Sequence, residues 1–455
     1  MSVGFIPNLR PLVALKALLT ASLVAATLAL QPAGGARAEG CAFPFTPTAY
    51  EGLRDRKLFL DTIELAAYNM LFPGDPYFGL PAIEIGGRGS GRAAEPGKVP
   101  PVLLKAIAYI ESSISQGAGT TPFGSVGPSL IAFDCGHGVA QVTTGMTVPT
   151  GEAGRGSPEQ ALVATHFAYN IARGAAILVD KWNEAPEENP IAGSDTGGHP
   201  ALIENWYYAV WNYNGFTGPG ANRSNHPMDP IYGAWPRTPY SCGPASDGLG
   251  HNRSNYPYQE LVIGCATNPP VVDESLLWQS QPISLPDLSK SAVGSALALD
   301  NFVFPYLRMD IPTAQPFHLD ETPMPPAGLR DTIVGNPGIA VSDTTLTIAY
   351  ADQIGAITKT VDIFNVGTGV LIWYATPSAP WLSVLPYTGV AIGLDYNCSG
   401  VACDRAGHLQ VTIDPSLLPS GISEGQVLLQ ALGTTQYQVI SVYLDDLTPL
   451  GIGPN

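Results

Sequence analysis

Apolar positions recur every three or four residues along several stretches of the chain before residue 266, which is the spacing of amphipathic helices. These stretches are RDRKLFLDTIELAAYNML, KVPPVLLKAIAYIESSIS, SPEQALVATHFAYNIARGAAILVDKW and ALIENWYYAVWNYNG. In the third stretch, Ser157 is followed by Pro158 and, three positions on, by Gln160, which predicts a capping box. We therefore predict helices for most of this region.

After residue 336 the pattern changes to short runs in which apolar and polar positions alternate. The runs are TLTIAY, TKTVDIFNV, VLIWYAT, WLSVLP, HLQVTI, GQVLLQAL and YQVISVYL. About seven such strands, separated by Gly, Pro and Asn turns, predict a β-sandwich. The intervening segment, 266–335, is rich in proline and shows no clear period, so it is either a flexible linker or a strap packed along the first domain.

At the N-terminus, Arg10 and Lys16 precede the apolar run ALLTASLVAATLAL, which ends in a small-x-small site at Ala38. This pattern predicts a secretory signal peptide, with an uncleaved membrane anchor as the alternative. At 455 residues the chain is long enough for two or three domains. The predicted order is a signal peptide at 1–38, a helical domain at 39–265, a proline-rich linker or strap at 266–335, a sandwich at 336–446 and a tail at 447–455.

The formal net charge is −17, and the predicted leader holds basic but no acidic residues, so the mature chain is more negative still. Such a chain is repelled by polyanions, so we expect no nucleic-acid partner. The same charge disfavours anionic lipid surfaces, and no membrane association is expected after the signal peptide is removed.

All six cysteines follow the predicted leader, and an even count in a secreted chain predicts disulfides. The alternative is a metal site that uses Cys135 and His137, but no second pair has ligand spacing. We therefore expect neither a metal nor a cofactor. The expected pairs are Cys398–Cys403, Cys242–Cys265 and Cys41–Cys135.

One carboxylate lies on an apolar helix face. On a helix that begins near Pro101, the residues Leu104, Ile107, Ala108 and Glu111 fall at spacings of three and four, so they share a face. Desolvation there would raise the pKa of the Glu111 carboxyl and keep it protonated near neutral pH, as a general acid requires. A buried structural glutamate and a solvent-facing helix end are the alternatives.

Four segments in order resemble the motifs of the soluble lytic transglycosylases and goose-type lysozymes. They are LLKAIAYIESS, GHGVAQVT, AYNIARGAAIL and YAVWNYNG, and the resemblance covers about 95–220. It implies a lysozyme-like lytic transglycosylase domain within 39–265, acting on the glycan strands of peptidoglycan. With the sandwich, the expected fold is multidomain, with a mainly α lysozyme-like catalytic domain and an all-β immunoglobulin-like sandwich.

The resemblance assigns Glu111 as the catalytic acid. Ala140 stands where the family has methionine, and Trp211 and Asn212 replace small residues, so the sugar subsites are expected to differ in shape. The residues that the resemblance assigns to substrate binding are Ser112, Gln141, Asn170, Tyr213 and Asn214.

Typical glycosidases use two carboxylates, but the four motifs contain no obvious second one. The resemblance implies substrate assistance. In this reaction Glu111 protonates the oxygen of the β-1,4 bond after N-acetylmuramic acid, the N-acetyl carbonyl of that sugar attacks its own anomeric carbon, and the 6-hydroxyl then closes a 1,6-anhydro ring. A lysozyme-type hydrolase is the alternative, and Asp134, 23 residues after Glu111, is its candidate for positioning water. Asp134 is alternatively a turn residue beside a cystine. A third possibility is a non-catalytic cell-wall-binding or adhesion protein.

The segment TKTVDIFNVGTGVLIWYATPSAPWLSVLPYTG resembles the BACON-type immunoglobulin-like domain. This resemblance implies attachment to a surface glycan or protein through the sandwich. Alternation predicts that Trp373 and Trp381 point into its core with Leu371 and Leu382. Aromatic residues between 206 and 258 are candidates to wall a glycan cleft, with core packing as the alternative. The expected location is secreted, extracellular or periplasmic.

Overall fold

The computed structural model describes residues 41–86, 92–188, 191–217, 224–243, 251–289, 310–350, 355–398, 403–419 and 424–446. The predicted signal peptide and C-terminal tail lie outside these residues. The described residues, from Cys41 to Asp446, belong to one compact unit.

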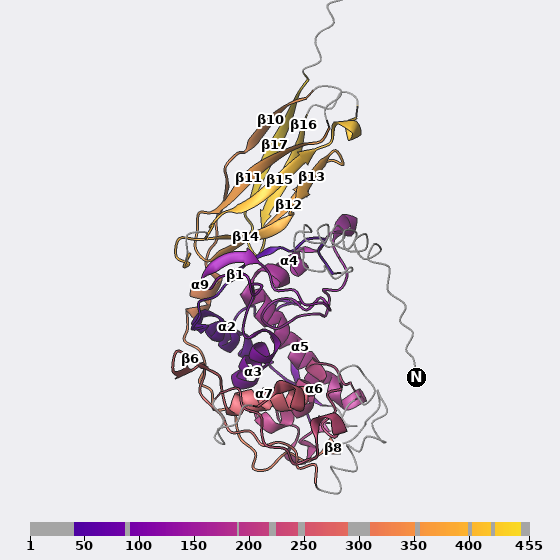
Figure 1. Cartoon of the computed structure of the whole chain (residues 1–455), viewed down its shortest axis with the longest axis vertical. Helices are drawn as coiled ribbons and strands as arrows, with labels where there is room; N and C mark the ends of the chain where they lie inside the picture. Colours follow the sequence, from indigo (N-terminus) through magenta and orange to yellow (C-terminus); the bar gives the residue numbers. More distant parts are fainter. Residues whose placement is uncertain are drawn as a thin grey trace, which may run out of the picture. The chain divides into compact units, whose positions relative to one another are not determined.

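Helices form where the apolar spacing predicts them (Figure 1). The predicted capping box is confirmed, because the Ser157 side chain accepts from the Gln160 N–H and the Gln160 side chain from the Ser157 N–H. The long helix predicted after Ser157 is interrupted at His166, whose backbone is extended. The helices are α2 (Lys57–Ala67), α3 (Pro101–Ser112), α4 (Pro158–Thr165), α5 (Phe167–Glu188), α6 (Tyr207–Tyr213), α7 (Tyr258–Thr267) and α9 (Leu329–Val334).

No single helix in the described part of the chain is long and apolar enough to span a membrane. One bent pair, Glu152–Thr165 with Phe167–Glu184, passes by length and composition alone.

The expected division into a mainly α domain and one all-β sandwich is wrong. Helix and strand take similar shares of the described residues, and short sheets lie among and after the helices. Strands of two to four residues, such as SVGP, are too short to show an alternating pattern. The two-stranded pairs are β1 (Thr48–Glu51) with β4 (Ser125–Pro128), β2 (Ile83–Ile85) with β3 (Ala93–Glu95), β5 (Ile191–Ala192) with β8 (Asp310–Ile311), and β6 (Val271–Val272) with β7 (Ser275–Leu276).

The C-terminal strands form two larger sheets. Trp373 and Trp381 are 1% and 2% exposed and pack with buried Leu371 and Leu382, which confirms their predicted core positions. In spatial order, the five-stranded sheet holds β10 (Thr345–Tyr350), β17 (Tyr437–Asp446), β16 (Glu424–Ala431), β12 (Val370–Pro377) and β14 (Thr388–Ile392). The four-stranded sheet holds β13 (Leu382–Leu385), β15 (Gly407–Ile413), β11 (Ile357–Asn365) and β9 (Ile339–Val341).

The sandwich shares one hydrophobic core with the helices. Tyr374 Oη donates to the Gly156 carbonyl, and the Gly156 N–H donates to Tyr387 Oη, each at 2.8 Å. The Arg155 guanidinium lies 4.0 Å from the centroid of the Tyr387 ring, a cation–π contact. The loop before α4 is therefore held directly by the five-stranded sheet.

The described parts of 266–335 favour the strap over the flexible linker. The buried Glu204 carboxylate accepts the backbone N–H groups of Ser284 and His318 at 3.0 and 2.8 Å. Tyr68 Oη donates to the carbonyl of Thr322. These contacts attach the strap to the helical part of the chain at Ser284 and again at His318 and Thr322.

All three predicted disulfide pairings are confirmed: Cys41–Cys135, Cys242–Cys265 and Cys398–Cys403. Structural disulfides persist in oxidising compartments, so the protein belongs to one. The bond between Cys41 and Cys135 closes a loop across a sequence separation of 94 residues.

Candidate active site

Glu111 lies in the last turn of α3, at the edge of the core. Ile107, Ala108 and Ile110 on the same helix are buried, whereas Glu111 is half-buried. Ser113 then adopts a left-handed conformation, with φ of 56°, and ends the helix. The carboxyl therefore stands between an apolar wall and the surface.

A tyrosine from a distant helix holds the Glu111 carboxyl. Tyr258 Oη, in the first turn of α7, donates a hydrogen bond of 2.5 Å to Glu111 Oε1. Burial raises the pKa of Glu111 to about 7. The hydrogen bond from Tyr258 and the positive charge of Arg253 lower this pKa, and the negative charge of Asp134 raises it. Near neutral pH this carboxyl can thus both give and take a proton.

Ser112 joins the end of α3 to the loop that carries Gln141. Its single Oγ proton lies between the carbonyls of Val139 and Ala108, which are 2.7 and 3.1 Å from the oxygen. The same oxygen accepts the Ser115 N–H at 3.0 Å. These three backbone contacts give Ser112 a positioning role, and its expected contact with substrate stays a prediction.

Asn170 is fully buried in α5 and holds the loop that carries Gln141 through hydrogen bonds on the core side of that loop. Its Oδ1 accepts the Ala140 N–H at 2.8 Å, and its Nδ2 donates to the carbonyls of His137 and Val163 at 2.7 and 3.0 Å. Asn170 therefore positions the loop. Its side chain is fully buried and its amide is bonded to backbone, so it has no exposed atom with which to make the expected contact to substrate.

Gly138 allows the loop to pass close to the core. Its φ is +63°, and a Cβ there would lie 2.4 Å from Gln116 Oε1 and 2.7 Å from Asn170 Nδ2. Larger side chains would therefore displace the amides that hold the loop.

Gln141 is half-buried, and its Nε2 donates to the Gly138 carbonyl at 2.8 Å. Gln141 Oε1 and Asp134 Oδ1 lie close to each other beside Gly136. A Cβ added to this glycine would lie 2.8 Å from the first oxygen and 3.3 Å from the second. Asp134 is exposed and accepts the Gly136 N–H at 3.2 Å, which is the turn role. Its charge nevertheless reaches Glu111.

Tyr213 closes another side of the site. Its Oη donates to the Ala140 carbonyl at 2.8 Å. Burial and then the charge of Glu111 raise the pKa of Tyr213, so the ring lies near that carboxylate. Asn214 is exposed, and its Oδ1 accepts from Asn225 Nδ2 at 3.2 Å. Tyr213 therefore belongs to the site, whereas Asn214 contacts the neighbouring loop.

Sequence analysis missed two residues around Glu111. Arg253 donates to the Ile110 carbonyl at 2.7 Å, which places a cation at the C-terminal end of α3, where the helix dipole favours it. Arg253 and Tyr258 are separated from these partners by 143 and 147 residues. The density of aromatic residues up to 258 pointed to this region without distinguishing Tyr258.

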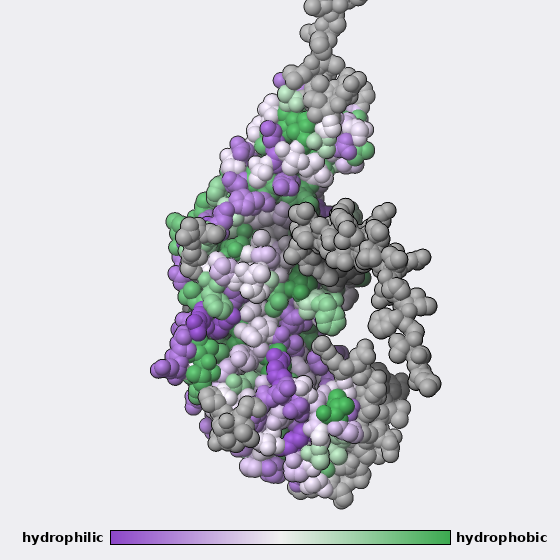
Figure 2. Space-filling model, in the orientation of Figure 1, coloured by the Kyte–Doolittle hydropathy of each residue, from purple (hydrophilic) through white to green (hydrophobic). Residues whose placement is uncertain are grey.

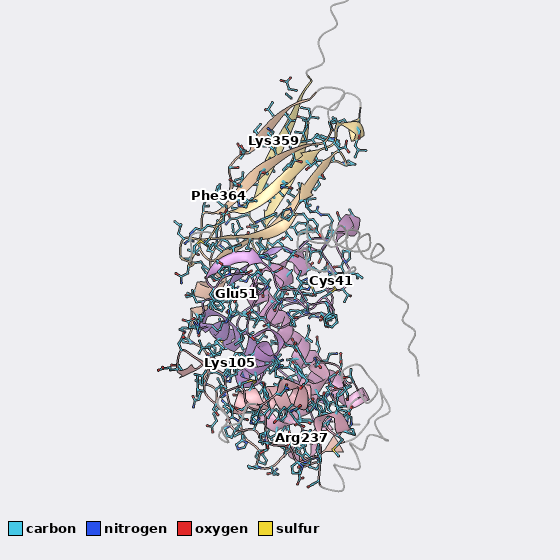
Figure 3. All side chains as sticks on the ribbon, viewed as in Figure 1. Cys41, Glu51, Lys105, Arg237, Lys359 and Phe364 are labelled. Atoms are coloured by element: carbon cyan, nitrogen blue, oxygen red, sulfur yellow. A yellow bond between two sulfur atoms is a disulfide. The ribbon has the colours of Figure 1, made fainter. Side chains whose placement is uncertain are left out.

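A buried ion pair supports the segment that follows α3. Glu51 (2% exposed) pairs with Arg56, and its Oε2 accepts the N–H groups of Gln116 and Gly117 at 2.9 and 2.7 Å (Figure 3 labels Glu51). Arg56 also donates to Ser115 Oγ at 2.9 Å. The pair thus connects β1 and the start of α2 to the chain just after Glu111.

The expected alternative of a metal site at Cys135 does not fit the structure, since its sulfur is bonded to Cys41. His137 Nδ1 lies 2.6 Å from the Cys135 carbonyl, and burial lowers its pKa to about 4, so its ring is neutral. Across the described ranges, no group of three or more His, Cys, Asp or Glu side chains is arranged to hold a metal ion.

Replacing Tyr258 by Phe is expected to move the alkaline limb of the pH–activity profile to higher pH. The Tyr258 hydrogen bond lowers the pKa of Glu111, so its loss raises that pKa further above its ordinary value. The profile should be recorded with purified cell walls. Tyr232→Phe is the control, because that hydroxyl donates to the Ser224 carbonyl. A limb that stays in place or moves to lower pH would contradict this role.

No family model matches the chain, and no curated protein matches it. Among solved structures, a protein of unknown function from Porphyromonas gingivalis W83 is 16% identical, with 24% of this chain and 46% of that chain covered and a TM-score of 0.19. WR4, a C. elegans MSP family member, is 14% identical over 24% of this chain and 97% of its own, with a TM-score of 0.17.

A family 123 glycoside hydrolase from Clostridium perfringens is 9% identical over 25% of this chain and 27% of its own, with a TM-score of 0.17. The chain spans less than half of the Porphyromonas protein. Likeness at this level carries no conclusion about function.

Proposed function

We propose that this protein is a secreted enzyme that cleaves the glycan strands of peptidoglycan, with Glu111 as its general acid and base. The observation that carries the proposal is the Glu111 carboxyl itself, half-buried, hydrogen-bonded by Tyr258 and with a pKa raised to about 7. The four segments that resemble lytic transglycosylases add to it. An extracellular or periplasmic location accords with the three disulfides.

In the proposed reaction, protonated Glu111 gives its proton to the glycosidic oxygen of the β-1,4 bond between N-acetylmuramic acid and N-acetylglucosamine. The bond from that oxygen to the anomeric carbon breaks as the acetamido carbonyl of the muramic sugar attacks the carbon. The Glu111 carboxylate then takes the proton of the 6-hydroxyl, whose oxygen displaces the acetamido group and closes a 1,6-anhydro ring. Glu111 ends protonated, and no water is consumed.

The hydrogen bond from Tyr258 occupies Glu111 Oε1, which leaves the other carboxyl oxygen to carry the transferred proton. Gln141 lies on the loop that contains Gly138 and Ala140, and Tyr213, at the end of α6, donates to the Ala140 carbonyl of that loop. These two residues are the proposed contacts to the sugar. Ser112 and Asn170 keep that loop in place.

A hydrolase of the lysozyme type is the second candidate. The observation that favours it is Asp134, an exposed carboxylate whose charge raises the pKa of Glu111 and which lies beside Gln141. In this reaction Asp134 would orient a water molecule toward the anomeric carbon, and the product would carry a reducing end.

The masses of the products distinguish the two reactions. We expect muropeptides released from purified peptidoglycan to carry 1,6-anhydro ends, lighter by one water than the hydrolysis products, because ring closure consumes no water. Digestion in water enriched in oxygen-18 provides the control, since only hydrolysis incorporates the label. Labelled reducing ends would replace the transglycosylase with the hydrolase, and no released muropeptide from wild-type protein would refute both.

A further inference from the structure

Arg253 stands beside the Glu111 carboxyl with part of its guanidinium unused. One nitrogen, Nη2, donates to the Ile110 carbonyl at 2.7 Å, and the residue is exposed. Within the described part of the chain, Arg253 forms no ion pair, and its other nitrogens have no hydrogen-bond acceptor. We propose that Arg253 binds the carboxylate of a free lactyl group on the muramic sugar. This inference rests on the proposed function and narrows its substrate to glycan strands whose peptide stems have been removed.

The segment that carries Arg253 holds the guanidinium in place relative to Glu111. Asn252 caps the short helix that Arg253 begins, because its Oδ1 accepts a backbone N–H of that helix at 3.0 Å. Further along the same segment, Tyr258 donates to Glu111 Oε1. Arg253 and Tyr258 thus reach the end of α3 together, one at the carbonyl of Ile110 and the other at the carboxyl of the residue that follows.

The positive charge of Arg253 is available to a ligand. Burial keeps Glu111 protonated below about pH 7, and a protonated carboxyl does not neutralise the guanidinium beside it. The charge extends beyond Glu111, since Arg253 also opposes the rise that burial causes in the pKa of Tyr240. The chain has 38 acidic and 21 basic residues, so acidic partners for a purely structural arginine are plentiful. That Arg253 pairs with none of those described leaves it to a carboxylate from outside the chain.

A carboxylate is the group that this guanidinium fits best. Arginine presents its N–H donors in one plane, where they bind both oxygens of a carboxylate, and such charge-assisted hydrogen bonds are stronger than neutral ones. In the phosphate-free glycan of the proposed substrate, the acidic group nearest the reacting bond belongs to the muramic sugar itself.

The lactyl group reports whether a peptide stem is present. It is an ether on the carbon next but one to the anomeric carbon of the muramic sugar, so it lies close to the bond that Glu111 is proposed to protonate. With a stem attached, the lactyl group ends in an uncharged amide. Without the stem, it ends in a carboxylate. A cation fixed beside Glu111 therefore distinguishes the two forms of the sugar at the point of cleavage.

The net charge of −17 does not exclude this ligand. Free lactyl groups occur on every second sugar, so the strand carries far fewer charges per length than nucleic acid. Salt screens distant charges beyond about 8 Å at physiological ionic strength, so the cation in direct contact decides. Figure 2 shows hydrophilic and hydrophobic residues mixed over the drawn face around α7 rather than one large apolar patch, which suits a hydrated ligand.

Isothermal titration calorimetry of the full chain tests this proposal. Every protein should also carry Glu111→Gln, which prevents cleavage and matches the uncharged acid. The ligands are a tetrasaccharide of alternating N-acetylglucosamine and N-acetylmuramic acid with free lactyl carboxylates, the same tetrasaccharide with these groups converted to methylamides, and the same tetrasaccharide with peptide stems. We expect the free acid to bind roughly tenfold more tightly than the methylamide, because a charge-assisted hydrogen bond is lost. Arg253→Gln should remove the difference by weakening the binding of the free acid alone.

Arg54→Gln is the matched control, because the side chain of Arg54 is 68% exposed and pairs with Asp273, and the preference should survive it. Arg253→Lys keeps the charge without the planar donors and should retain only part of the preference. Thermal unfolding of each variant checks its fold, and the comparison of ligands on Glu111→Gln alone needs no change at Arg253.

Three results would overturn the proposal: a free acid that binds no more tightly than the methylamide, a preference that persists in folded Arg253→Gln, or a stem-carrying ligand that binds more tightly than the free acid. The readout is binding, so it is separate from the test of the proposed function. A preference for the free acid without cleavage by the wild type would refute the enzyme and leave the carboxylate site standing, whereas cleavage without the preference would do the reverse.

Discussion

Replacing Glu111 by Gln is expected to lower the rate of clearing of purified cell walls by roughly 10²–10⁴-fold, the contribution of a general acid and base. The amide has nearly the shape of the acid and can still accept the hydrogen bond from Tyr258. It cannot transfer a proton to the glycosidic oxygen. Turbidity of wall suspensions measures the loss.

The stability of the same variant supplies its control. The folded protein keeps the Glu111 proton up to about pH 7, whereas the unfolded chain releases it near the ordinary value of 4.5. Between these values the folded state binds more protons, so the stability of the wild type falls as pH rises, whereas the amide of the Glu111→Gln variant has no proton to lose. The melting temperature of E111Q minus that of the wild type should therefore increase from pH 5 to pH 8. Wild-type clearing by a folded E111Q would refute the mechanism.

Replacing Arg56 by Met is expected to destabilise the protein by about 3–5 kcal/mol, the usual cost of removing one partner from a buried ion pair. Arg56 is 7% exposed, and without it the buried Glu51 carboxylate keeps, among the described residues, the backbone N–H groups of Gln116 and Gly117 as its hydrogen-bond donors. Burial already raises the pKa of Glu51. Urea unfolding with the disulfides intact measures the change in free energy.

Lys57→Met is the matched control, because Lys57 is the next residue and pairs with Asp61 in solvent, with its side chain 75% exposed. Exposed pairs contribute at most about 1 kcal/mol. If Arg56→Met costs no more than Lys57→Met, the buried pair does not support the segment after α3. The double variant Glu51→Gln, Arg56→Met should recover part of the loss, since it removes the buried charge.

Local features of the helices were predictable from the sequence, and their interruptions were not. The capping box at Ser157 depends on residues three positions apart, and it is present. The break at His166 depends on its ring, whose Nδ1 accepts the Ala168 N–H at 3.0 Å. Histidine is not among the usual helix caps, and the apolar spacing continues through it.

The short strands escaped prediction for another reason. Thr48–Glu51 pairs with Ser125–Pro128, and neither is long enough to show a period of two. Their pairing depends on contacts across more than seventy intervening positions, which no local pattern records. The expected mainly α domain fails there, whereas β15 and β16 alternate between buried and more exposed positions over seven and eight residues, which is long enough to detect.

For the candidate site, the sequence named residues on three separate segments, but it did not indicate which backbone groups each side chain would bond. Gln141 and Tyr213 donate to the carbonyls of Gly138 and Ala140, and Ser112 and Asn170 likewise bond to the backbone of this loop. Burial raises the pKa of Glu111, and the two groups that reduce this shift, Tyr258 and Arg253, come from the segment around α7, far along the chain. Helical spacing could indicate that the carboxyl is desolvated, but not which hydroxyl would reach it.

The disulfide between Cys41 and Cys135 makes a covalent ring of the chain between them, and α3 with Glu111 lies inside that ring. A protease that cuts the chain once within the ring leaves both pieces attached to the rest of the molecule. In surroundings rich in proteases, a nicked protein would keep its proposed acid tethered beside the loop that supports it. The damage would become visible on a denaturing gel only after reduction.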